Sequence, residues 1–174
     1  MALRLGRCLA AGLAVLLGLG GVALGNTGLA EFMANNGQLR AELRVRDGQH
    51  GVVGETGTLW VIEPSGAFEV ASFVNQKVGP PEREGNLTAE QIERVAQSLA
   101  SQRFSDLPRQ IGEAAPANAR VISVAFGQDS ATLMLPPGPP VDLERLVAQQ
   151  ADEPGPRGKL LAIVGTVLEV TTAD

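Results

Sequence analysis

An alternating stretch at residues 39–46 is the feature that most constrains the fold. Every odd-numbered residue in it is apolar and every even-numbered residue is charged, without exception over the stretch. Successive side chains of a β-strand point to opposite faces, so this pattern predicts a strand with one buried and one solvated face. We expect it to end at Asp47 and Gly48, where a glycine-rich loop begins. A half-buried strand of this kind requires a sheet with a covering layer.

Two hairpins supply the rest of the predicted sheet. Residues 58–62 and 68–73 flank a turn that contains Pro, Ser and Gly, and residues 121–126 and 131–135 flank a second polar turn. The segment at 58–62 is apolar on both of its faces. With the alternating strand, these segments predict an antiparallel sheet of about five strands, and they leave the strand order open.

Three helices are predicted after the first hairpin. Thr88 and Gln91 have the spacing of a capping box, and apolar residues recur at helical spacing from there to about Arg103. Asp142 is positioned to cap a short second helix. Residues 159–171 carry β-branched side chains that favour a strand, but their apolar spacing and length favour a helix, which we adopt.

These elements predict one α+β domain. The antiparallel sheet packs against the amphipathic helix that begins after Thr88, and two further C-terminal helices complete the cover. The domain spans residues 38–174, and the small and polar residues 26–37 are interpreted as a linker. A hydrophobic content of 44% is that of a globular chain.

The first 25 residues have the layout of a secretory signal peptide. Arg4 and Arg7 precede an uncharged run at 8–25, which ends in small residues before Asn26. We therefore predict export to the periplasm or the extracellular space. The run is also close to the shortest length that spans a bilayer, so the alternative is a retained single-pass anchor and a membrane-tethered envelope protein.

Composition excludes several classes of function. The net charge of −5 gives no electrostatic source for nucleic-acid binding. His50 is the single histidine, and Cys8, the single cysteine, lies in the segment expected to be removed. We accordingly predict no metal, no cofactor and no catalytic residue.

The charged side of the alternating strand is the candidate partner-binding strip. It places Arg40, Arg44 and Arg46 on one exposed face of an otherwise acidic protein. Such a strip could receive an acidic partner. The alternative is a solvated strand face or a charged sheet edge that prevents aggregation.

Two hydrolase hypotheses remain as alternatives. In the first, His50 acts as a general base, oriented by Asp47 or Glu55, on Ser65 as the nucleophile. No nucleophile-elbow motif supports it, and a solvated loop histidine is the simpler interpretation.

The second hydrolase hypothesis uses a pair of carboxylates. Glu63 and Glu69 flank the first hairpin turn and could face each other in the manner of a glycosidase pair. Two solvated glutamates near strand ends are the simpler interpretation, and an aromatic content of 3% leaves few platforms for a sugar.

The block from residue 59 to residue 149 resembles a known type of small secreted domain. It contains, in chain order, a hairpin with its turn at 65–68 (SGAF), a helix start at 85–91 (GNLTAEQ), a helix exit at 104–108 (FSDLP), a second hairpin and a trailing leucine-rich helix. In this order it is similar to emfourin-type inhibitors of thermolysin-like metalloproteases. The aromatic residues expected in the fourth strand are reduced to Phe126. The resemblance implies protein binding or inhibition and transfers no site residue.

The sequence therefore predicts an exported, non-catalytic domain that binds another exported protein, with an inhibitor as the more specific form. A membrane-tethered protein and a hydrolase are the alternatives. The oligomeric state and the identity of the partner are left open.

Overall fold

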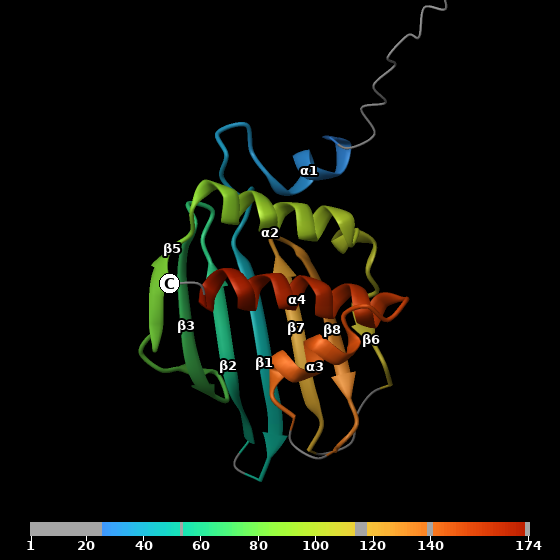
Figure 1. Ribbon diagram of the computed structural model, residues 1–174. Helices are drawn as coiled ribbons and strands as arrows, with labels where there is room; N and C mark the ends of the chain where they lie inside the picture. The colour runs from blue at the N-terminus through green and yellow to red at the C-terminus, as the bar shows by residue number, and fades with distance from the viewer. Residues whose placement is uncertain (1–25, 53, 114–117, 139–140, 173–174) are drawn as a thin grey trace, which may run out of the picture.

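A single large sheet forms the framework of the chain (Figure 1). The computed structural model describes residues 26–172, except 53, 114–117 and 139–140. The described strands are β1 (Leu43–Gly51), β2 (Gly54–Ile62), β3 (Ala67–Val74), β4 (Lys77–Val78), β5 (Arg83–Asn86), β6 (Gln110–Ile111), β7 (Arg120–Phe126) and β8 (Asp129–Leu135). Their order is β4-β3-β2-β1-β7-β8-β6, and β5 also pairs with β3. All the pairs are antiparallel except β6 with β8.

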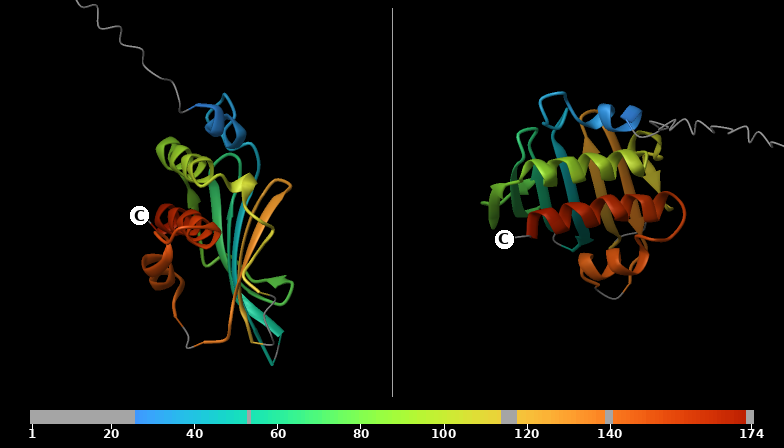
Figure 2. Two further views of the ribbon diagram at one scale, coloured as in Figure 1. Left: turned by 90° about the vertical axis from the view of Figure 1, so that its right-hand side faces the viewer. Right: turned by 45° about the horizontal axis from the view of Figure 1, so that its top comes forward.

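The helices cover one face of this sheet. α2 (Ala89–Ser101) and α4 (Pro156–Thr172) lie side by side across the strands, and α3 (Leu143–Gln150) packs below α4 (Figures 1 and 2). A short 3-10 helix, η1 (Phe104–Asp106), follows α2. The α+β architecture, the two hairpins, the amphipathic helix and both C-terminal helices are thus confirmed.

The helix starts obey the predicted capping chemistry. The Thr88 hydroxyl accepts a hydrogen bond from the Gln91 backbone N–H at 3.2 Å, and the Gln91 side chain accepts one from the Thr88 N–H at 2.8 Å. The Asp142 carboxylate accepts from the Arg145 N–H at 2.7 Å at the start of α3. Residues 159–171 are helical, because the apolar side chains of α4 fill the space over the sheet and most of them are buried.

The predicted count of about five strands is wrong, because the described chain has eight. The additional strands β4, β5 and β6 are only two to four residues long. They form by pairing with the outer edges of β3 and β8, and a segment this short shows no alternation that a sequence could reveal.

The first strand also differs from its prediction. β1 begins at Leu43 rather than at residue 39, and it continues through Asp47 and Gly48 to Gly51. The glycine-rich segment is therefore the far end of the β1–β2 hairpin, where Gly48 pairs with Gly57. A Cβ atom on Gly57 would overlap the backbone carbonyl of Asp47, so this close approach needs glycine.

The segment interpreted as a linker is part of the folded domain. Residues Asn26–Phe32 form helix α1, which packs against α2. Phe32 is 1% exposed, and its ring meets that of Phe126 edge-on at 5.4 Å. The linker interpretation is wrong because Phe32, an aromatic residue in a polar, glycine-containing stretch, is buried in the core.

The N-terminal segment predicted as a signal peptide, residues 1–25, lies outside the described residues. Within the part of the chain that is described, no helix has the length and apolar character needed to cross a membrane.

Candidate functional site

The face of the sheet that α2, α3 and α4 leave uncovered is the candidate site, and we call it the outer face (Figure 2, left). The strand register assigns each residue to a face, since directly paired residues share one. An outward-facing sheet side is normally polar. Here two groups of outward residues are apolar: Leu59, Val61, Ala71 and Phe73 on β2 and β3, which we call the apolar centre, and Val121, Ala125 and Met134 on β7 and β8. Arg44 and Arg46 of β1 lie between the two groups.

These outward residues are distinct from the hydrophobic core. None of them belongs to the cluster of buried side chains that joins the sheet to the helices, as far as the described residues show. Ala71 and Phe73 are nevertheless 4% and 3% exposed, and the others are half-buried by their neighbours on the strands. The outer face therefore has a small, ordered apolar centre of its own.

Arg46 helps to build that centre. Its guanidinium carbon lies 3.9 Å from the centre of the Phe73 ring, and its Nη2 donates to Glu55 Oε2 and to the Asn75 carbonyl, both at 2.8 Å. Gly48 makes room, because a Cβ there would approach the Phe73 ring to 2.9 Å. Arg46 is thus held by intramolecular contacts.

The other two arginines of the predicted strip occupy different places. Arg40 precedes β1, and its Nε donates to the Ala30 carbonyl of α1 at 2.6 Å. Arg44 is exposed on the outer face and pairs with Glu42. The hydrogen bond to Glu42 raises the pKa of Arg44 above its ordinary value. The structure therefore leaves Arg44 as the arginine best placed to meet a partner on the outer face.

β1 lies in the middle of the sheet, between β2 and β7. The alternative that Arg44 and Arg46 protect a sheet edge is therefore wrong, because β1 is paired on both sides along most of its length.

A hollow lined by four glutamates adjoins Arg44 on the outer face. Its volume is about 520 Å³, and Glu42, Glu63, Glu69 and Glu84 line it together with Arg44. Glu69 and Glu84 are direct cross-strand partners on β3 and β5. Neither has an ion-pair partner among the described residues, and like charges directly opposite destabilise a sheet. The hollow is thus a concentrated acidic spot beside an apolar centre.

The two glutamates of the glycosidase hypothesis lie in this hollow. Glu63 lies immediately after the end of β2 and Glu69 lies on β3, as expected from their positions on either side of the hairpin turn. The sequence did not predict that Glu42 and Glu84 would join them. Glu42 lies immediately before β1, and Glu84 lies on β5. The signal for the apolar centre was available in residues 58–62, which are apolar on both faces.

The structure does not bring the proposed His50 and Ser65 pair together. His50 lies near the β1–β2 turn and pairs in register with Glu55, whereas Ser65 lies in the β2–β3 turn at the opposite end of β2. Asp47 faces the helix-covered side and is bound by Arg120, Nε to Oδ1 and Nη2 to Oδ2, both at 2.7 Å. No group of three His, Cys, Asp or Glu side chains suited to a metal ion occurs within residues 26–172 as described.

Comparison with known proteins gives no assignment. No protein-family model matches the chain, and no curated protein sequence matches it. The candidate site must therefore be interpreted from its own geometry.

Proposed function

We propose that the chain is an exported, non-catalytic domain that binds another exported protein through the outer face of its sheet. One observation carries the proposal: the outer face has an apolar centre where a solvated sheet face would be polar. Contiguous apolar surface that is rimmed by charge is typical of protein interaction sites. The helices already cover the other face, so the outer face is the one available to a partner.

The charges around the apolar centre indicate what the partner presents. Four carboxylates and one arginine line the hollow, and Arg44 is already paired with Glu42. A partner with an apolar patch and an adjacent Lys or Arg side chain would complement this surface. Its cation would also relieve the repulsion between Glu69 and Glu84.

Inhibition of a metalloprotease is the more specific form of the proposal. It rests on the resemblance of residues 59–149 to emfourin-type inhibitors, with no residue transferred. Export rests on the signal-peptide layout of residues 1–25.

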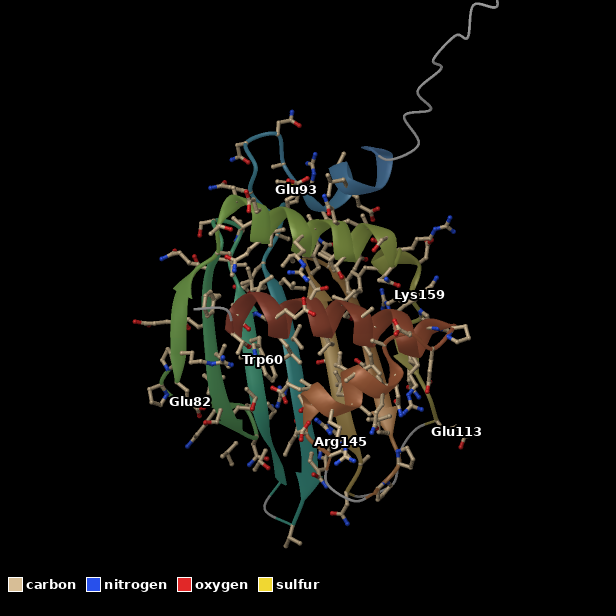
Figure 3. The ribbon with its side chains drawn as sticks, in the orientation of Figure 1. Trp60, Glu82, Glu93, Glu113, Arg145 and Lys159 are labelled. Carbon is tan, nitrogen blue, oxygen red and sulfur yellow. The ribbon has the colours of Figure 1, made fainter. Side chains whose placement is uncertain are left out.

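Affinity capture from the exported fraction of the source organism tests the proposal. The bait is the purified protein, compared with the Glu69→Lys/Glu84→Lys double variant. Glu93→Lys is the matched control, since Glu93 is exposed on α2, on the opposite side of the molecule (Figure 3). We expect a saturable partner that the double variant loses and the control retains. A partner captured equally by all three baits, or no partner, would overturn the proposal.

A direct assay decides the inhibitor form. The purified protein is titrated into thermolysin, and peptide hydrolysis is followed. Stoichiometric inhibition that the double variant weakens would support it. Full protease activity at an excess of the protein would exclude thermolysin itself as a target and leave general protein binding as the proposal.

A further inference from the structure

The helix-covered face of the sheet changes from apolar to polar halfway along its central strands. The apolar inward residues are Leu43, Val45, Trp60 and Ile62, and the polar ones are Asp47, Gln49, Thr56 and Thr58. The register pairs Asp47 with Thr58 and Gln49 with Thr56, so the polar side chains gather in one patch. Asp47 and Thr58 are half-buried at positions that are normally apolar beneath a helical layer, whereas Gln49 and Thr56 are exposed.

A cavity of about 410 Å³ opens at this change of polarity. It lies where the lower ends of β1, β2 and β7 face α3 and the start of α4 (Figure 1). The polar patch forms one wall. Apolar side chains line the rest of the cavity, among them Leu135 on β8, Leu146 on α3 and Val141. A cavity of this size, apolar on one side with a few convergent polar groups, is typical of small-molecule sites.

Among the described residues, the cavity lining carries two arginines but only one carboxylate. Asp47 and Arg120 form a neutral pair, with side chains 16% and 18% exposed, and Arg120 also donates to the Val141 carbonyl. Arg157, in the first turn of α4, lines the same cavity. It forms no ion pair with any other described residue, and its Nε is buried without a hydrogen-bond acceptor. A buried donor without an acceptor is unfavourable, and a guanidinium matches a carboxylate with two parallel hydrogen bonds.

We infer that this cavity binds a small amphipathic monocarboxylate. The carboxylate pairs with Arg157, and the aliphatic tail lies against Leu135, Val141 and Leu146. A single negative charge fits best, because Arg157 is the one unpaired cation in the cavity lining as described and Asp47 would repel a second negative charge. The cavity lies on the opposite side of the sheet from the outer face, so this inference is independent of the proposed function.

Calorimetric titration of the full-length protein with hexanoate tests the inference, and hexanamide serves as the neutral analogue of the same length. The key variant is Arg157→Gln, and the control is Arg145→Gln, which removes an exposed arginine of α3 outside the cavity lining (Figure 3). We expect saturable binding of hexanoate, about tenfold weaker binding of hexanamide, and a similar loss for Arg157→Gln. The Arg145→Gln variant should bind hexanoate as the wild type does.

Two further measurements test whether the binding is lost for the expected reason and occurs in the cavity. Urea unfolding of Arg157→Gln verifies that the variant is folded, as we expect because Arg157 forms no ion pair with a described residue. Backbone amide shifts in the NMR spectrum should move at Thr58 and Asn118 on titration and stay fixed at Val61 on the outer face. No saturable binding of butanoate, hexanoate or octanoate up to about 10 mM, or equal binding by Arg157→Gln, would overturn the inference.

Discussion

At the scale of single residues, Arg46 and Arg44 illustrate how the same residue type on one strand can have opposite roles. We expect Arg46→Ser to lower the free energy of unfolding by about 1–3 kcal/mol, since it removes the ion pair with Glu55 and the stacking on Phe73. Arg44→Ser should cost less than about 0.5 kcal/mol, because its pair with Glu42 is exposed. Urea unfolding of both variants measures the difference. Equal values would mean that Arg46 is not part of the outer-face centre.

Gly57 provides a second residue-scale prediction, because the main chain of β1 leaves no space for a side chain there. A Cβ atom would overlap the Asp47 carbonyl, so Gly57→Ala must push β1 and β2 apart and should cost about 2 kcal/mol or more. Gly51→Ala in the same hairpin is the control, since its Cβ would lie in ordinary van der Waals contact, 3.7 Å from the Gly54 carbonyl oxygen. Thermal unfolding that shows the same midpoint for both variants would contradict this account.

At the scale of elements, α1 is a helix that the sequence did not predict. Phe32→Ala should lower the free energy of unfolding by about 3–5 kcal/mol, because the ring is fully buried against Phe126. Met33→Ala should cost less, since Met33 is only half-buried. Chemical denaturation of the two variants measures this. A loss below about 1 kcal/mol for Phe32→Ala would restore the linker interpretation.

The elements that were predictable have signals within one segment. The capping box at Thr88, the cap at Asp142 and the apolar spacing of α4 each depend on residues a few positions apart, and all were confirmed. β4, β5 and β6 depend on edges supplied by distant strands, so no local pattern marks them. The candidate site follows the same division. Glu63 and Glu69 flank one turn, whereas Glu42 and Glu84 join them only through the sheet.

At the scale of the whole molecule, the sheet separates the main core from the proposed protein-binding surface. The helix-covered face holds the main core, and the outer face holds charges that the fold does not neutralise. Glu69 and Glu84 are directly opposed in a chain whose net charge is already −5. Their repulsion should therefore lower the free energy of unfolding of the unbound protein. A basic partner should remove this repulsion when it binds.

This separation predicts that neutralising the hollow stabilises the protein while impairing its binding. The free energy of unfolding of the Glu69→Gln/Glu84→Gln double variant should exceed that of the wild type by about 0.2–1 kcal/mol at low salt. This gain should shrink at about 0.5 M NaCl, because salt screens the repulsion between the two carboxylates in the wild type. Glu93→Gln on α2 is the control and should change little at either salt concentration, because Glu93 is exposed outside the hollow. Urea unfolding at both salt concentrations gives the comparison. A double variant that is less stable than the wild type at low salt would show that the carboxylates support the fold, and the argument from charge complementarity would fail.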